Sequence, residues 1–191
     1  LCADCWSTTE YGEECYYGSD AAAYTGLIER NGSQIAVVDG IPCRNSDFSF
    51  DGKYYWANDD YTLTELKNND WTYIDFDSCR GYRYVKDGKI LKDCVEKIGA
   101  YYYCFDSNGV MQTNGVVTIW NPSAKTYYAD ENGHLKKNFW FSRSRELTFD
   151  KGNTEPNLYN QILYFGDNFE SCSGFQTIDV KLYYFASHNM V

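Results

Sequence analysis

The residues that most often carry catalysis are sparse in this chain of 191 residues. His134 and His188 are its two histidines, and both occupy turn-like positions where a solvated polar side chain is expected. The sequence contains no Gly-x-Ser-x-Gly elbow, no phosphate-binding loop and no His-Glu-x-x-His motif. We therefore predict no catalytic residue and expect that the chain is not an enzyme.

Paired carboxylates offer another chemistry, because glycoside hydrolysis needs two of them about 5 to 10 Å apart across a sugar cleft. The acidic clusters of the chain are Asp59-Asp60, Asp75 with Asp77, and Asp130-Glu131. They lie at turn-like or strand-end positions, where short acidic side chains bond to the backbone, and none follows the spacing of an EF-hand. We expect solvated turns here, and a glycosidase is only a third hypothesis.

Cysteine is the remaining reactive residue type, and its eight copies are an even number, as expected for disulfides in a secreted chain. Cys2-x-x-Cys5 with Cys15 nearby could begin a zinc site, but the second CxxC or paired histidines that complete such sites are missing. We favour disulfides over metal and predict no cofactor. The one pairing that we name is Cys94 with Cys104, because a turn near residues 97–100 would bring their strands side by side.

The formal net charge of −10 argues against nucleic acid or anionic lipid as the main partner, because both are bound through Lys and Arg. Neutral sugars and cationic ligands remain open. No apolar run approaches 18 residues, so we expect no membrane insertion. The chain begins at Leu1 rather than Met, which indicates a trimmed or processed N-terminus, and we expect a secreted or cell-surface protein.

The elements that must position these residues are predicted to be strands. Aromatic residues make up 18% of the chain, with 19 Tyr against two Met, a composition that favours sheets over a helical core. A tyrosine can pack its ring while its hydroxyl stays in water, which suits thin layers close to solvent. We therefore predict an all-β fold.

Short internal repeats support this prediction, because aromatic doublets recur about every 20 to 28 residues, enough for one hairpin and a connector. The copies are 115–119 with 125–135, 174–178 with 181–185, 102–111, 52–56 and, most degenerate, 82–90. Dipeptides that tolerate positive φ and favour tight turns accompany them: Asp51-Gly52, Asp87-Gly88, Asn108-Gly109 and Asn132-Gly133.

A single hairpin is marginal in water, so successive hairpins must stack on one another. We predict a β-hairpin repeat solenoid. Residues 1–40 form an irregular, cysteine-rich N-terminal cap, and 41–191 form degenerate hairpin repeats with an insertion around 142–170. Its expected loop is 153–157, which contains a Pro between Asn and Glu residues.

These repeats resemble the cell-wall-binding repeat family, which includes choline-binding modules of Gram-positive surface proteins, glucan-binding repeats of glucansucrases and repeats of clostridial toxins. The strongest matches are Gly174-Phe175-Gln176-Thr177-Ile178-Asp179 with Lys181-Leu182-Tyr183-Tyr184-Phe185, and then residues 102–111. The clear similarity covers roughly 98–137 and 172–191, with weaker copies across 48–93. It implies a non-catalytic module of an exported bacterial protein.

In choline-binding members of the family, the quaternary ammonium sits in an aromatic cage, held by cation–π attraction. The walls are a Trp after the leading Gly, a Trp beside the Tyr pair and an aromatic residue of the next repeat. Two of the clearest copies depart from this pattern: the first wall position holds Val116 and Phe175, and the second holds Thr126 and Leu182. These copies therefore lack cage walls.

Sugar binding needs less, because a flat aromatic ring can stack on a pyranose while nearby polar groups reach its hydroxyls. Packing within the repeats is the ordinary role of such rings, and adjacent strand residues face opposite sides, so one Tyr of each doublet should be buried. The candidate ligand-binding residues are Trp56, Trp71, Tyr102, Trp120, Tyr127, Trp140 and Tyr183.

Our leading hypothesis is a carbohydrate or cell-wall-polymer binding module whose partner is a polysaccharide, cell-wall polymer or host glycan. The alternative is a structural or protein-adhesion domain that holds no small ligand. A groove lined by aromatic rings from adjacent repeats would favour the first hypothesis, and closed packing of these rings would favour the second.

Overall fold

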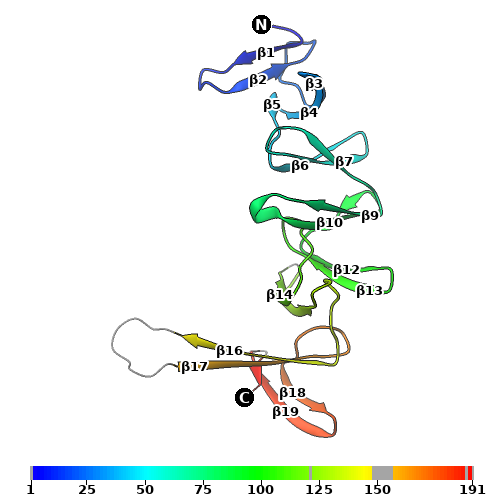
Figure 1. Cartoon of the computed structure of the whole chain (residues 1–191), viewed down its shortest axis with the longest axis vertical. Helices are drawn as coiled ribbons and strands as arrows, with labels where there is room; N and C mark the ends of the chain where they lie inside the picture. Colours follow the sequence, from blue (N-terminus) through cyan, green and yellow to red (C-terminus); the bar gives the residue numbers. More distant parts are fainter. Residues whose placement is uncertain (1, 121, 148–156, 188, 191) are drawn as a thin grey trace. The chain divides into compact units, whose positions relative to one another are not determined.

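A computed structural model describes residues 2–120, 122–147, 157–187 and 189–190. The chain divides into two compact units, which are described separately: Leu1–Lys92 with Asn108–Val110, and Asp93–Ser107 with Met111–Val191. Both consist of short antiparallel strands joined by tight turns (Figure 1). The all-β prediction is therefore confirmed.

The first unit contains four hairpin-based sheets. Strand β1 (Cys5–Thr8) pairs with β2 (Glu14–Tyr17). Three three-stranded sheets follow, and their strands are β3 (Gly26–Arg30), β4 (Ser33–Val38), β5 (Ile41–Pro42); β6 (Ser46–Phe50), β7 (Lys53–Ala57), β8 (Leu63–Leu66); and β9 (Asp70–Ile74), β10 (Gly81–Lys86), β11 (Lys89–Ile90). A one-turn 3₁₀ helix, η1 (Asp77–Cys79), joins β9 to β10.

The second unit repeats the same plan. Its sheets are formed by β12 (Cys94–Ile98) with β13 (Tyr101–Phe105), β14 (Gly115–Ile119) with β15 (Lys125–Ala129), β16 (Phe139–Leu147) with β17 (Asn157–Phe165), and β18 (Gly174–Ile178), β19 (Lys181–Ala186) and β20 (Asn189–Met190). Each sheet is an antiparallel hairpin of neighbouring strands.

Turn chemistry places these hairpins where the sequence predicts them. Asp51-Gly52 joins β6 to β7, and Asp87-Gly88 joins β10 to β11, with positive φ at both residues of each pair. A second backbone feature precedes several hairpins: the Asn or Asp immediately before the first strand has a left-handed conformation. These residues are Asp4, Asn45, Asn69, Asp93, Asn114 and Asn138.

Two regions differ from what the sequence led us to expect. Residues 1–40 contain β1 to β4 rather than an irregular segment, because Trp6, Tyr16 and the apolar residues of β3 and β4 form regular ladders without any repeat motif. The insertion around 142–170 lengthens one hairpin, since β16 and β17 pair over nine residues where most hairpins pair over four or five. Most of the loop expected at 153–157 lies outside the described residues.

The hairpins share one register, which fixes the two faces of each. Counting from the first residue of the first strand, the first, third and fifth cross-strand pairs form what we call the odd face, and the second and fourth form the even face. The strand residue opposite the first position is almost completely buried in six hairpins: Val37, Ala57, Phe105, Ala129, Phe165 and Phe185 are 0 to 1% exposed. The odd face therefore anchors the core.

The core itself consists of small clusters rather than one large centre. Trp56, Leu66, Ile74 and Val85 pack together in the first unit, next to a cluster of Ala36, Phe48 and Tyr55. The cluster in the second unit contains Cys104, Ile119, Tyr127, Ala129 and Leu135. Each cluster joins consecutive hairpins, as expected for repeats that cannot bury an apolar face alone.

Candidate functional site

The even face carries the positions at which the resembled family places its cage walls. In β14–β15 the second cross-strand pair is Val116 with Tyr128, and the fourth is Thr118 with Thr126. Both wall positions, Val116 and Thr126, therefore lie on the even face, one on each strand. The same register locates the equivalent residues in every other hairpin.

Hairpin β9–β10 has aromatic residues at both wall positions. Its second pair is Trp71 with Tyr84 and its fourth is Tyr73 with Tyr82, so Trp71 and Tyr82 are the equivalents of Val116 and Thr126. Among the hairpins that the structure describes, no other combines two aromatic residues at these positions. The copy that is most degenerate in sequence thus has the fullest set of rings.

The four rings form a continuous surface that we call the β9–β10 aromatic face: Trp71, Tyr73, Tyr82 and Tyr84. Ring centroids are 4.9 Å apart for Trp71 and Tyr84, 5.1 Å for Tyr73 and Tyr82, and 6.4 Å for Trp71 and Tyr82. All three pairs meet edge to face, the favourable geometry for aromatic pairs. Tyr73 is 49% and Tyr82 47% exposed, so the surface is open to solvent.

The odd side of the same hairpin holds this face in place. Ile74, Arg83 and Val85 are buried there, and Ile74 and Val85 pack with Trp56 of β7. Because successive strand residues point to opposite sides, burying Arg83 and Val85 turns Tyr82 and Tyr84 outward. At the start of β9, the Asp70 carboxylate accepts a hydrogen bond of 2.8 Å from the backbone N–H of Trp71.

Polar groups accompany the rings at the end of the hairpin that leads into η1. The Asp75 carboxylate and the Arg80 guanidinium, which directly follow β9 and precede β10, form an exposed ion pair with an N–O distance of 2.6 Å. Rings that stack on a sugar, next to groups that accept and donate hydrogen bonds, are what carbohydrate recognition requires. The surface is also suited to a cationic group, which aromatic faces attract.

Two of the predicted ligand residues are core residues instead. Trp56 is 3% exposed, with the Arg83 guanidinium 4.4 Å from its ring centroid and Phe76 at 6.2 Å. Tyr127 is 6% exposed, and burial, with smaller effects of Glu170 and Cys104, raises the pKa of its hydroxyl to about 12. Their rings are covered because Trp56 meets the next hairpin and Tyr127 lies on the odd face.

The other predicted rings do not gather around one place. Trp120 is 71% exposed and follows the end of β14, whereas Tyr102 packs on Phe169 at 4.8 Å. Trp140 and Tyr183 do meet, with their centroids 5.1 Å apart, and Phe185 lies 6.0 Å from Trp140. Of the seven predicted residues, Trp71 alone belongs to the β9–β10 aromatic face.

Sequence reasoning missed Tyr73, Tyr82 and Tyr84. A signal was present, because Trp71 and Tyr73 are two residues apart, as are Tyr82 and Tyr84, and that period places each pair on one side of a strand. Residues 82–90 are the most degenerate repeat copy, because Arg83 interrupts the Tyr doublet there, and none of these three tyrosines is among the predicted ligand residues.

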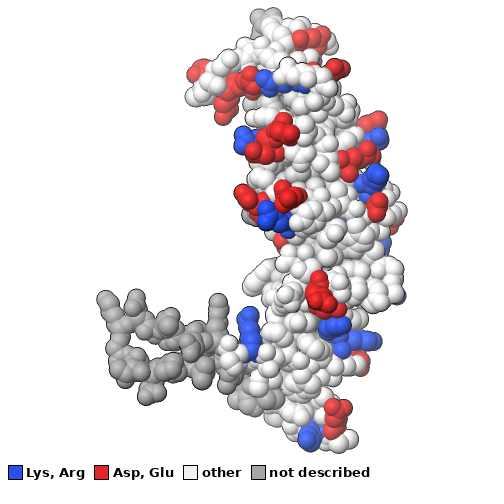
Figure 2. Space-filling view, viewed as in Figure 1, with Lys and Arg blue, Asp and Glu red and all other residues white. Residues whose placement is uncertain are grey.

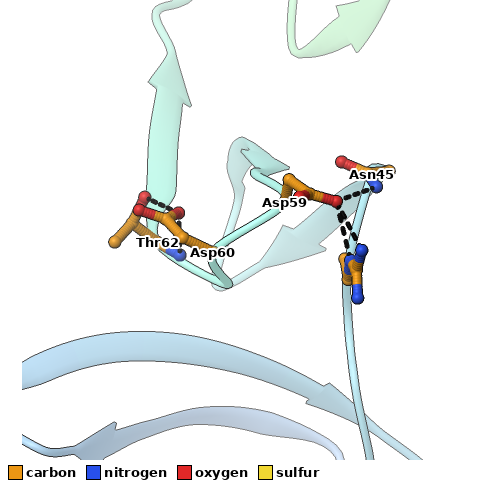
Figure 3. Close-up of polar contacts among 5 residues, drawn as sticks. Asn45, Asp59, Asp60 and Thr62 are labelled. Carbon is orange, nitrogen blue, oxygen red and sulfur yellow. Dashed lines mark hydrogen bonds and ion pairs between the residues drawn. The ribbon is translucent and has the colours of Figure 1, made fainter. Parts of the chain in front are cut away.

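Asp60 accepts hydrogen bonds within the turn that follows β7, as predicted, whereas Asp59 accepts hydrogen bonds from residues that precede β6 (Figure 3). Hydrogen bonds from the Asn45 amide and the Arg44 guanidinium lower the pKa of Asp59, and bonds from the Thr62 hydroxyl and backbone N–H lower that of Asp60. With Trp56, Phe76 and Asp75, these carboxylates line a cavity of about 330 Å³. Both carboxylates are engaged by the protein itself.

The cysteines only partly follow the predicted pattern. Cys2 and Cys5 form a disulfide, whereas no disulfide joins Cys94 to Cys104, which lie on the paired strands β12 and β13. The register places Cys94 opposite Phe105 and Cys104 opposite Val95, an offset of one residue that directs the two side chains to opposite faces. Burial, together with the nearby Cys94, raises the pKa of Cys104 to about 12.

Within the described ranges, no three His, Cys, Asp or Glu side chains gather in a way that could hold a metal ion. The described residues also contain no helix of the length and apolar character needed to cross a membrane.

Comparisons with known proteins give structural neighbours only. No protein-family model and no curated protein sequence matches the chain. The solved structures that resemble it include choline-binding proteins, the class that the sequence resemblance named. One is choline-binding protein F from Streptococcus pneumoniae, with a TM-score of 0.47 and 16% identity over 94% of this chain and 55% of that chain.

Two further solved structures also resemble the chain. CbpJ from Streptococcus pneumoniae has a TM-score of 0.47 and 15% identity, covering 98% of this chain and 63% of that chain. An alternansucrase in complex with isomaltononaose has a TM-score of 0.34 and 17% identity, covering 97% of this chain and 16% of that chain. This chain therefore spans less than two thirds of each of these structures.

Proposed function

We propose that the chain is a non-catalytic module that binds carbohydrate or cell-wall polymer on the β9–β10 aromatic face. One observation carries the proposal: four aromatic rings lie together on the outward face of a single hairpin, and about half of the surface of Tyr73 and of Tyr82 is exposed. An exposed group of large rings costs free energy in water, and a patch of this kind is typical of a binding site.

The arrangement favours a ligand with flat, weakly polar faces and hydroxyl groups at its rim. A pyranose ring would stack on Trp71 or Tyr82, and its hydroxyls would reach Asp75 and Arg80. Chain charge supports the same ligand class, since the net charge of −10 repels polyanions such as nucleic acid. On the surface drawn in Figure 2, many Lys and Arg side chains lie beside Asp or Glu.

The wider setting that we propose is that of an exported bacterial protein acting outside the cell, with the hairpins stacked as a solenoid. Polysaccharides and cell-wall polymers occur outside the cell, and a stack of hairpins would present several even faces to one polymer. Weak sites of this kind gain avidity when a single chain engages more than one of them.

Binding of the intact chain to purified Gram-positive cell walls and to soluble isomalto-oligosaccharides tests the proposal. We expect Trp71→Ala to weaken binding at least about fivefold, because one stacked ring contributes about 1 to 3 kcal/mol. Trp120→Ala is the matched control, since it removes an exposed Trp that lies outside the aromatic face. Equal losses in the two variants, or no binding at millimolar ligand, would contradict the proposal.

A structural or protein-adhesion role is the second candidate, and hairpin β18–β19 favours it. Phe175 is 71%, Leu182 67% and Val180 97% exposed, an apolar surface without the ring cluster of β9–β10. If Phe175→Ser abolishes attachment to a protein-coated surface while Trp71→Ala leaves it intact, the adhesion role replaces the sugar-binding one.

A further inference from the structure

A cavity of about 380 Å³ lies in the first unit between the β6–β7 hairpin and the segment that contains β11. Phe48 and Ile90 supply apolar walls, and the polar lining consists of Asp47, Ser49, Tyr54, Lys89 and Lys92. This volume is at the small end of the range for ligand-binding pockets, which suits a group the size of one sugar.

Three residues that line the cavity, Asp47, Ser49 and Tyr54, lie on the even face of their hairpin. Asp47 pairs with Trp56 at the second position of the ladder, and Ser49 pairs with Tyr54 at the fourth. Asp47 and Tyr54 are therefore the equivalents of Trp71 and Tyr82 in the next hairpin. The same two positions hold two aromatic rings in β9–β10, and a carboxylate and one ring in β6–β7.

The charge around this cavity is positive, although the chain as a whole is acidic. Lys92 forms an ion pair with Asp47, and the Arg83 guanidinium Nε lies 4.0 Å from the same carboxylate. Lys89 adds a third cation, and within the described ranges no carboxylate lies at ion-pair distance from it. The cavity is therefore lined by two lysines, Lys89 and Lys92, and by one carboxylate, that of Asp47, which Arg83 also approaches.

The buried part of this cluster is not fully satisfied. Arg83 is 1% exposed, and its Nε and Nη2 have no hydrogen-bond partner among the described residues, nor has the buried Oδ1 of Asp47. A buried cation is costly unless opposite charge or hydrogen bonds compensate it. Negative charge brought into the adjacent cavity would therefore be favoured, and a cationic ligand would be repelled.

We infer that this cavity binds the anionic group of an acidic sugar, a carboxylate or a phosphate, with Lys89 and Lys92 as its charged donors. The Ser49 hydroxyl supplies a further donor, and the Tyr54 ring and Ile90 contact the apolar face of the sugar. The sugar part of this ligand rests on the proposed function, whereas the anionic part rests on the cavity alone.

Chemical-shift titration of the intact, isotope-labelled chain provides the test, with glucuronate, glucose 6-phosphate, glucose and inorganic phosphate as probes at millimolar concentration. We expect both acidic sugars to shift the backbone amides of Ser49 and Tyr54, and glucose to leave them unshifted. A stronger response to glucuronate indicates a uronic acid ligand, and a stronger response to glucose 6-phosphate indicates a phosphorylated one. Either response supports the site.

Lys89→Gln removes one charged donor from the cavity. We expect this variant to bind acidic sugars about fivefold to tenfold more weakly, the loss expected for one partly exposed charged contact. Lys53→Gln is the matched control, because Lys53 lies in β7 of the hairpin that borders the cavity, is exposed and does not line the cavity. Acidic-sugar binding that is unchanged in Lys89→Gln, or equal shifts with glucose, would overturn the inference.

The outcome is separable from that of the proposed function. Trp71→Ala should leave acidic-sugar binding to the cavity unchanged, because Trp71 is not among its lining residues. Inorganic phosphate that shifts Ser49 while no sugar binds anywhere would retain the anion site and reject the carbohydrate role. Absence of any anion-dependent shift would reject the site and leave the β9–β10 aromatic face untouched.

Discussion

Hairpins β9–β10 and β14–β15 have the same register but different chemistry on their even faces. In β9–β10 these positions hold Trp71, Tyr73, Tyr82 and Tyr84, and two of the rings are about half exposed. In β14–β15 the wall positions hold Val116 and Thr126, and Tyr128 is packed against Phe139 and Phe141 of the next hairpin. The odd faces of both hairpins hold their buried residues: Ile74, Arg83 and Val85 in the first, and Ile119, Tyr127 and Ala129 in the second.

The comparison indicates that the residues that make a repeat recognisable in the sequence are not those that would bind a ligand. The Gly, the first Tyr of the doublet and the turn residues of β14–β15 belong to the odd face or to the turns, where packing and backbone geometry determine the residue type. The constraint on an even-face residue depends on whether the next hairpin covers it, as it covers Trp56 and leaves the Trp71 surface open. A clear repeat motif therefore indicates a sound scaffold and says little about the ligand.

The largest effect that we expect concerns the odd face of β14–β15. Tyr127→Ala should lower the free energy of unfolding by about 3 to 5 kcal/mol, because it removes a large ring that is 6% exposed in the core of the second unit. Chemical denaturation measures this loss. Sugar binding by the folded variant should be unchanged, and a binding defect in Tyr127→Ala would break the distinction between the two faces.

A smaller effect should distinguish the turns that follow β10 and β15. Gly88 follows β10 with φ +72° and open space around an added Cβ, whereas Gly133 follows β15 with φ +81° and with the Met111 side chain 2.8 Å from that position. Gly88→Ala should cost about 1 kcal/mol of stability and Gly133→Ala about 2 kcal/mol, since both strain the backbone and the second also crowds Met111. Thermal unfolding of the pair checks this order, and equal losses would show that Met111 simply moves aside.

The smallest effect concerns Asp130 in the turn after β15. Burial acts to raise the pKa of this carboxyl, but Lys136 and the backbone N–H groups of His134 and Asn132 outweigh it and lower the pKa below its ordinary value. The stabilisation is complete above the unfolded pKa of about 3.9 and is lost as the pH falls through the lower folded value. Lys136→Ala should raise the Asp130 pKa in an NMR titration, and an unchanged pKa would assign the shift to the backbone alone.

The strands and turns could be predicted from sequence because their causes are local. Aromatic and β-branched runs bounded by Asp51-Gly52 and Asp87-Gly88 are sufficient to place β6, β7, β10 and β11. The N-terminal hairpins were missed, since they carry no Tyr doublet, and the lengthened hairpin β16–β17 was recognised only as an insertion.

The site was harder to predict because exposure depends on what the next hairpin covers. Trp56 and Trp71 are indistinguishable as isolated residues, yet Trp56 packs with Ile74 and Val85 while Trp71 joins an open surface. The basic cavity could not be predicted from the sequence for a similar reason. Lys89 and Lys92 are about 40 residues from Asp47 and Tyr54, and only the stacking of hairpins brings these four side chains around one space.

Local pairing has a consequence for how the chain acquires its structure. In the described hairpins the longest ladder contact, Phe139 with Phe165, spans 26 residues, and every other pairing is shorter. Short loops close at low entropic cost, so each hairpin can form soon after its own sequence emerges during synthesis, without waiting for the C-terminus. Hairpins can therefore form independently at several places in the chain, and neighbouring hairpins dock on one another in a later step.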